Sequence, residues 1–140
     1  MSKVKFFVTP GYGERKLEKH HYSQAVKVGN RIEISGQGGW DDNEEFPESV
    51  EDEVIRAFDN VERTLALAGA SWKDVIHVNS YHVPTATDSI GAEHLSVMTD
   101  QFRKRMGARA PIWTCIGVPS LGDRGMRVEI RVTAIVEESA

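Results

Sequence analysis

The chain has 140 residues, of which 40% are hydrophobic and 27% charged, and its formal net charge is −4. These values are typical of one globular domain, here residues 1–140, that folds without disulfides or metals. The acidic balance disfavours nucleic-acid binding, which needs a basic surface. The single cysteine, Cys115, excludes an intrachain disulfide framework. With no signal-like or membrane-spanning stretch, we expect a cytosolic protein without membrane contact.

The first predicted elements form a β-hairpin. An apolar start at residues 4–8 is followed by a Pro- and Gly-containing break and by a charged connector at residues 14–19. Residues 22–28 and 31–37 are strand-like runs, and Gly29 with the following asparagine between them suits the positive φ angles of a tight turn. The sequence therefore predicts two antiparallel strands here.

Two helices are predicted next. Ser49 and Asp52 resemble a capping box, and Gly69 follows as a helix stop. The apolar residues that repeat at helical spacing between them are Val50, Val54, Phe58, Val61, Leu65 and Ala68. A second helix is expected from about Asp88 to Met106, with Gly107 as its stop. Its expected inward side chains are Leu95, Met98, Phe102 and Met106.

Three further strands complete the predicted fold. They are residues 74–83, residues 112–118 and a last strand that follows Met126. In the last strand, Val128, Ile130, Val132 and Ala134 alternate with Arg127, Glu129, Arg131 and Thr133. Such alternation is typical of a strand with one buried and one polar face. The order β-β-α-β-α-β-β predicts an α+β fold, with one sheet and two helices on one face.

The common catalytic motifs are absent from the sequence. It contains no Walker loop, no GxGxxG after a strand, no GxSxG elbow and no HExxH. His20 and His21 are the only close pair of histidines, and adjacent side chains of an extended chain point to opposite sides. We therefore expect neither a metal site nor a cofactor.

Four separated segments, in order along the chain, resemble the Rid (YjgF) family. They are Tyr22–Asn30 with Ile34–Gln37, Ala57–Val61 with Ala68–Val75, the strand around Cys115, and Val128–Ile130. This resemblance implies a chorismate-mutase-like fold and a homotrimer, with ligand sites in the clefts between subunits. It also implies an imine/enamine deaminase activity, in which reactive enamines and imines are hydrolysed to ketones with release of ammonia.

The resemblance also implies a set of site residues. Glu129 would hold the attacking water, a general acid–base role that suits a carboxyl whose pKa is raised by partial burial, and Tyr22 would assist it. The substrate-binding residues implied are Ser35, Gly36, Gln37, Trp113 and Cys115. The alternative for Glu129 is an ion pair with Arg127, Arg131 or a neighbouring subunit. The alternative for Cys115 is a small buried hydrophobic residue.

One position departs from the family pattern. Trp113 stands two residues before Cys115, where the family has an arginine that holds a substrate carboxylate, and tryptophan cannot form that charged clamp. Arg109 is the nearby residue that could replace it. Strand parity places Trp113 opposite Ile112 and Ile116. If Ile112 packs under the helices, Trp113 faces the cleft near Tyr22 and favours flat or apolar ligands; the alternative is a structural tryptophan.

Three functions are compatible with these observations. The first is an enzyme that adds water to a small imine, enamine or related intermediate, and the second is a trimer that binds a small metabolite without turnover. A Glu129→Gln variant separates them, because only the enzyme needs the carboxyl. A ribonuclease or translation inhibitor is the third, and the acidic net charge argues against it.

Overall fold

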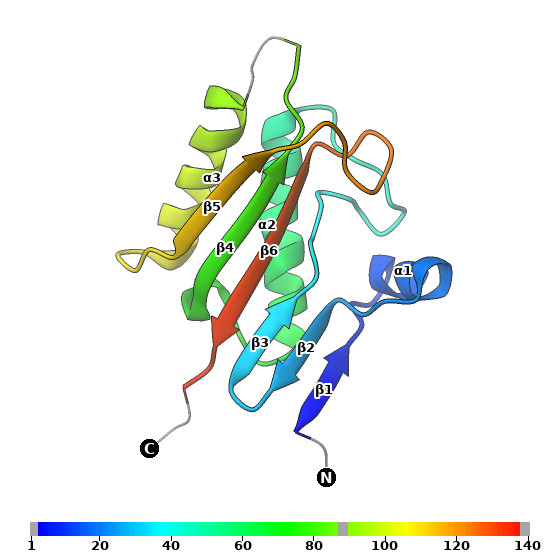
Figure 1. Cartoon of the computed structure of the whole chain (residues 1–140), viewed down its shortest axis with the longest axis vertical. Coiled ribbons are helices and arrows are strands. Elements are labelled where there is room, and N and C mark those ends of the chain that lie inside the picture. Colours follow the sequence, from blue (N-terminus) through cyan, green and yellow to red (C-terminus); the bar gives the residue numbers. More distant parts are fainter. Residues whose placement is uncertain (1–2, 87–89, 138–140) are drawn as a thin grey trace.

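Figure 1 shows the protein as a computed structural model, which describes residues 3–86 and 90–137. The strands are β1 (Val4–Phe7), β2 (Ala25–Val28), β3 (Arg31–Ile34), β4 (Val75–His82), β5 (Ile112–Gly117) and β6 (Val128–Ile135). The helices are α1 (Tyr12–His20), α2 (Val50–Leu67) and α3 (Gly91–Met106), with a 3-10 turn at Trp72–Asp74. The strands form one sheet in the order β1-β2-β3-β6-β4-β5.

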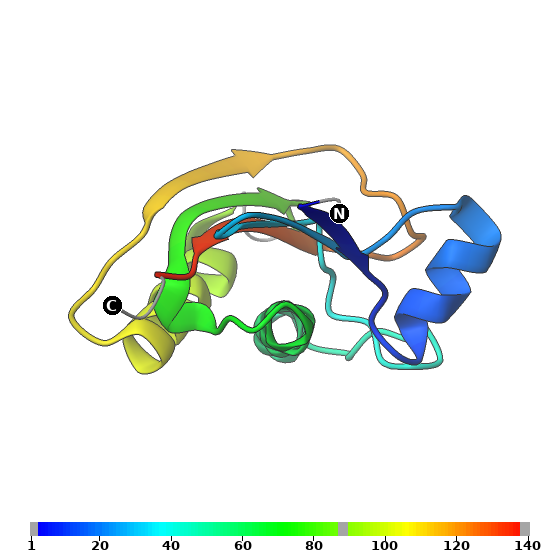
Figure 2. The same ribbon diagram turned by 90° about the horizontal axis from the view of Figure 1, so that it is seen from below.

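Helices α2 and α3 cover one face of this sheet and leave the other face bare (Figure 2). All neighbouring strands are antiparallel except β4 and β5, which α3 connects in parallel. The predicted α+β fold with both long helices on one face is therefore confirmed. We call the two sides of the sheet the helix face and the bare face.

The predicted apolar stripe of α2 is buried throughout, and Ser49 caps the helix by accepting a hydrogen bond from the Asp52 N–H at 3.1 Å. In α3, Met98 and Met106 are buried as expected, but Leu95 is 37% exposed, so that prediction is wrong. The inward stripe runs instead through the fully buried His94. The predicted start at Asp88 lies outside the described residues.

Helix α1 replaces the charged connector predicted at residues 14–19. The Glu14 carboxylate accepts a hydrogen bond from the Gly11 N–H at 2.9 Å and so satisfies a free donor at the helix start. The helix turns Tyr12 and Lys16 inward, and these residues are 0% and 2% exposed. Because one of these two inward side chains is a lysine, the sequence shows no apolar periodicity here.

The predicted hairpin is present with shorter strands, and Gly29 has the expected positive φ of 59°. Beyond β3 the chain turns toward β6, where Gln37 and Ile130 exchange backbone hydrogen bonds of 2.8 and 2.9 Å. In β6 the alternating Val128, Ile130, Val132 and Ala134 are all buried, as predicted. No helix in the described residues combines the length and apolar character needed to cross a bilayer.

Candidate functional site

The side chain of Glu129 lies on the bare face, against the backbone of Gly36. Glu129 is opposite Tyr81 of β4, near the end of the sheet where β6 begins. A Cβ atom added to Gly36 would clash with the Glu129 carboxyl group, so any other residue there would force this carboxyl to move. In the described residues, no hydrogen bond occupies the Gly36 N–H. A carboxyl group and a backbone donor therefore lie side by side.

Glu129 is half-buried, and its carboxyl makes no hydrogen bond or ion pair with another described residue. Burial raises its carboxyl pKa, Asp123 raises it further, and Lys16 acts in the opposite direction. The arginines considered as partners are engaged elsewhere. Arg127 Nε lies 2.7 Å from Glu53, and Arg131 Nη2 lies 3.0 Å from Glu33. Neither Arg127 nor Arg131 is therefore the ion-pair partner of Glu129 in the described part of the chain.

Tyr22 belongs to the same cluster, just before β2. Its burial, followed by the charges of Asp123, Glu129 and Glu44, raises its phenol pKa to about 12. The phenol therefore keeps its proton at neutral pH and is available as a hydrogen-bond donor. Glu129 thus lies against Gly36 and acts electrostatically on Tyr22.

Ser35 and Gln37, the other two residues of this segment, use their side chains to hold the backbone. The Ser35 hydroxyl donates to the Gln24 carbonyl at 3.2 Å. Gln37 is fully buried, accepts a 2.7 Å hydrogen bond from the Tyr12 hydroxyl, and donates from Nε2 to the Ser35 carbonyl at 3.2 Å. These bonds position Gly36 beneath Glu129.

Trp113 and Cys115 are not part of this cluster, and the expected orientation of Trp113 is wrong. Its ring packs on the helix face, with its centroid 5.2 Å from that of Phe102 in α3. Ile112, which was expected under the helices, is 66% exposed. In the parallel register, Trp113 lies opposite the buried Val78, and the helix side of β5 therefore carries the tryptophan.

A buried hydrogen-bond network surrounds Trp113. Its indole Nε1 donates to the Ser80 Oγ at 2.9 Å, and Ser80 Oγ lies 2.8 Å from His82 Nε2. His82 Nδ1 in turn lies 2.9 Å from His94 Nδ1. Burial and then His94 lower the pKa of His82 to about 4, so His82 is neutral at physiological pH. Cys115, beside Ser80, is partly exposed, and burial raises the pKa of its thiol.

Arg109, considered as a replacement for the missing arginine, lies far from Glu129 along the sheet. It precedes β5 and donates to the Lys73 carbonyl at 3.1 Å. Ile112, at the start of β5, pairs with His77, whereas Glu129 pairs with Tyr81 near the other end of β4. Arg109 is therefore not placed beside the Glu129 carboxyl within the chain.

Lys16 and Asp123 are site neighbours that the sequence did not indicate. The Lys16 ammonium lies 2.6 Å from an oxygen of Asp123 and 3.3 Å from one of Glu44. Asp123 also acts electrostatically on both Tyr22 and Glu129. The available signal was the four-residue spacing from Tyr12 to Lys16, which places both on one helical face.

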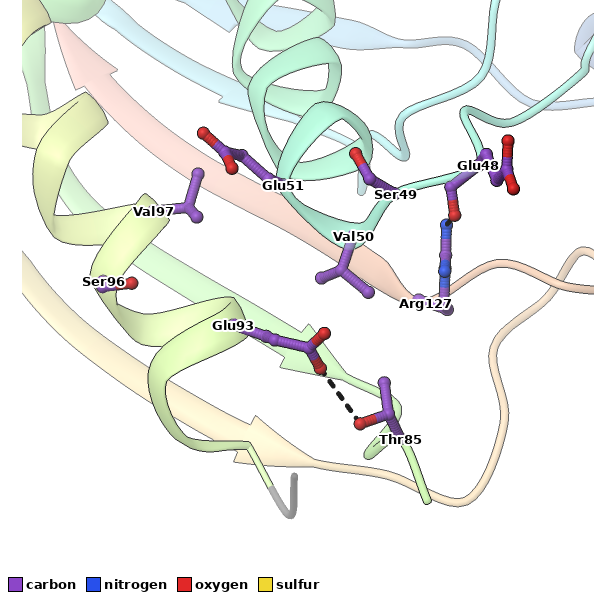
Figure 3. A pocket seen from close by; sticks show the side chains of 9 residues that line it. All are labelled: Glu48, Ser49, Val50, Glu51, Thr85, Glu93, Ser96, Val97 and Arg127. Atoms are coloured by element: carbon purple, nitrogen blue, oxygen red, sulfur yellow. Dashed lines mark hydrogen bonds between the residues drawn. The ribbon is translucent and has the colours of Figure 1, made fainter. Parts of the chain in front are cut away.

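Glu129 does not line the described surface pockets of about 490, 430 and 230 Å³. The pocket of about 490 Å³ in Figure 3 lies between the first turns of α2 and α3, on the helix face. There Glu93 accepts a 3.0 Å hydrogen bond from Thr85, and Glu51 and Glu93 complement the helix dipoles. Of residues 3–86 and 90–137, no three acidic, histidine or cysteine side chains are grouped to hold a metal.

Comparison with known proteins assigns the family. The family model described as Endoribonuclease L-PSP matches residues 14–136. The chain is 32% identical over 120 residues to the RutC family protein YjgH of Escherichia coli K12, covering 86% of each. It is also 32% identical over 123 residues to a Dermatophagoides farinae protein named 2-iminobutanoate/2-iminopropanoate deaminase, covering 83% of this chain and 86% of that protein.

A solved structure of Protein YJGH has the same fold. It matches with a TM-score of 0.81 and 29% identity, and the match covers 98% of this chain and 99% of that one. Family model, sequence relatives and fold agree with the motifs found along the sequence. The chain belongs to the YjgF (Rid) family, whose model is described as Endoribonuclease L-PSP.

Proposed function

We propose that this protein hydrolyses a small imine or enamine by adding water, with Glu129 as the residue that holds and activates the water. The observation that carries the proposal is the environment of Glu129. Its carboxyl is half-buried, has no partner among the described residues, and lies beside the open N–H of Gly36. A carboxyl with a raised pKa exchanges protons closer to neutral pH than an exposed one, as acid–base catalysis requires.

The proposed chemistry has two steps. In the first, the Glu129 carboxylate accepts a proton from water while the water oxygen bonds to the imine carbon, and Glu129 then gives this proton to the imine nitrogen, which forms a carbinolamine. In the second, Glu129 moves the proton of the carbinolamine hydroxyl to the amine nitrogen, so that the C–N bond breaks, a ketone and ammonia leave, and the carboxylate is regenerated. Tyr22, which keeps its proton at neutral pH, donates a hydrogen bond to the substrate or the water.

A homotrimer with sites between subunits is part of this proposal, and the bare face supports it. This face carries exposed apolar side chains near both sheet edges: Val4, Phe6 and Val28 from β1 and β2, and Ile112 and Ile116 from β5. Apolar patches on two different edges suit a head-to-tail contact that closes into a ring. Light scattering at micromolar concentration should give three times the chain mass of 15.6 kDa; a monomer would contradict the assembly.

The proposed substrate is not a small imino acid of the type named for the Dermatophagoides farinae relative. Position 113 holds tryptophan, Trp113 lies on the helix face, and Arg109 lies toward the other end of the sheet. A charge-assisted hydrogen bond contributes about 1.5 to 3 kcal/mol, so catalytic efficiency on 2-iminopropanoate should be roughly ten- to a hundred-fold below that of a relative with the arginine. Equal efficiency would show that another cation binds the carboxylate.

The decisive experiment measures ammonia release from imines generated in the assay by an amine or amino-acid oxidase. Glu129→Gln should reduce the rate by about a hundred- to ten-thousand-fold. Glu33→Gln is the matched control, because Glu33 faces the same side of the sheet but is paired with Arg131. A Glu129→Gln protein with unchanged turnover would eliminate the mechanism. If the parent protein has no turnover and Glu129→Gln binds the ligand as the parent does, the result would support a metabolite-binding trimer.

Endoribonuclease activity is a second candidate, because the description of the matched family names it. The net charge of −4 does not favour RNA binding. RNA cleavage that persists through further purification and disappears in Glu129→Gln would support this candidate over imine hydrolysis.

A further inference from the structure

Lys16 is a buried lysine at the edge of the candidate site. Lys16 is 2% exposed, and its ammonium group lies 4.2 Å from the centroid of the Trp40 ring. An ammonium removed from water is costly unless it is paired. Here Asp123 and Glu44 supply the pairing, at 2.6 and 3.3 Å. A lysine held in this way is fixed in position rather than free to follow a ligand.

The two partner carboxylates come from different loops. Glu44 lies between β3 and α2, and Asp123 lies between β5 and β6. Lys16 therefore joins α1 to two segments that are far apart in the sequence. The same helix is bonded to the segment beneath Glu129, because the Tyr12 hydroxyl, one turn before Lys16, donates to Gln37 next to Gly36 at 2.7 Å. In agreement with this placement, Asp123 raises the pKa of both Glu129 and Tyr22.

We propose that Lys16 is a positioning residue of the Glu129 site, whose buried ammonium group holds Asp123 in place and balances the negative charge beside Glu129. Its importance for turnover rests on the function proposed above, but its effect on Glu129 does not. Lys16 does not itself contact substrate in this proposal, since its ammonium group is already occupied by two carboxylates.

The charges around Glu129 determine the expected effects. Asp123 acts on it from the β5–β6 loop and Lys16 from α1, while Tyr22 keeps its proton at physiological pH. Tyr81 of β4 lies opposite Glu129 in the sheet. Removing the ammonium group leaves Asp123 uncompensated, which makes ionisation of Glu129 harder. Removing the Asp123 charge has the opposite effect.

The test is a direct titration of Glu129 in the assembled protein. Carboxyl ¹³C resonances of labelled glutamates are followed against pH, and the Glu129 signal is assigned by its loss in Glu129→Gln. The titration midpoint should move up in Lys16→Met and down in Asp123→Asn, and Lys16→Arg should restore it toward the parent value. These opposite directions are not expected of two residues that merely stabilise the fold.

Lys19→Met is the matched control. Lys19 lies on the same helix and pairs with the same Glu44 at 2.8 Å, but its side chain is 58% exposed, so the Glu129 midpoint should stay unchanged. An unmoved midpoint in both folded Lys16→Met and Asp123→Asn would overturn the proposal, as would an equal shift in Lys19→Met. If Lys16→Met does not fold, Asp123→Asn and Lys16→Arg decide the question.

These outcomes are separable from those of the proposed function. Shifted midpoints in a protein that hydrolyses no imine would retain the role of Lys16 and reject the hydrolase. Normal hydrolysis with unmoved midpoints would retain the hydrolase and reject the role of Lys16.

Discussion

The two faces of the sheet carry contrasting polar clusters at the same end. Tyr81 pairs with Glu129 on β6, and its chain neighbours Ser80 and His82 point to the helix face. On that face, Ser80 and His82 are fully buried and bonded to each other, as expected of groups that hold a fold together. On the bare face, Glu129 has no partner among the described residues. The contrast teaches that Glu129, whose carboxyl has no partner among the described residues, is the better candidate for a functional role than the fully bonded Ser80 and His82.

The largest effect on stability is expected when a charge is placed in the helix-face cluster. Trp113→Arg should lower the free energy of unfolding by about 3 kcal/mol, because it loses the packing on Phe102 and buries a cation. Trp113→Phe should cost only about 1 kcal/mol, the value of the bond to Ser80. Urea unfolding at fixed protein concentration measures both. If the Trp113→Arg protein is stable and hydrolyses substrates that carry a carboxylate, the result would show that Trp113 belongs to the ligand site after all.

The pH dependence of stability is expected to have opposite signs for the titrating groups of the two faces. The pKa of folded His82, about 4, is below its unfolded value of 6.5, so the stabilising contribution is complete above pH 6.5 and is lost as the pH falls toward 4. Between pH 7 and pH 5 the loss should be about 2 kcal/mol. Glu129 acts with the opposite sign, because its raised pKa lowers stability as the pH rises above its unfolded value.

Urea unfolding at the two pH values measures the His82 effect. His82→Gln should flatten the dependence, while replacement of the exposed His20 by Gln should leave it unchanged. An equally steep dependence in His82→Gln would assign the proton uptake to another group.

The smallest effects on stability are expected from substitutions at two glycines, one beside Glu129 and one in the hairpin turn. Gly36→Ala should reduce turnover at least about ten-fold by displacing Glu129, with little change in unfolding free energy, because its φ is not positive. Gly29→Ala should do the reverse: its φ is 59° and its surroundings are open, so stability falls by about 1 kcal/mol and turnover is unchanged. Thermal unfolding and imine hydrolysis on both variants would check this. Loss of turnover in both would point to a general change of fold.

The sequence predicted those parts of the fold in which periodicity and burial agree. In α2, every residue of the apolar stripe is buried, and in β6 the alternation matches the two faces. It failed where an apolar residue faces outward or a charged one inward. Ile112 lies exposed on the bare face, which reversed the expected side of Trp113, and the burial of Lys16 concealed α1. Tyr22, Gly36 and Glu129 were found by resemblance, whereas Asp123 needed the folded arrangement of loops.

The position of β6 has a consequence for how the chain folds. It is the last strand in sequence, yet it lies between β3 and β4 in the sheet. Before it is added, β1-β2-β3 and β4-β5 are two separate pieces with no strand pairing between them. Their union requires contacts distant in sequence, which slows folding. During synthesis, the strand that completes the sheet thus also delivers the Glu129 carboxyl, so the sheet and the candidate site are completed at the same time.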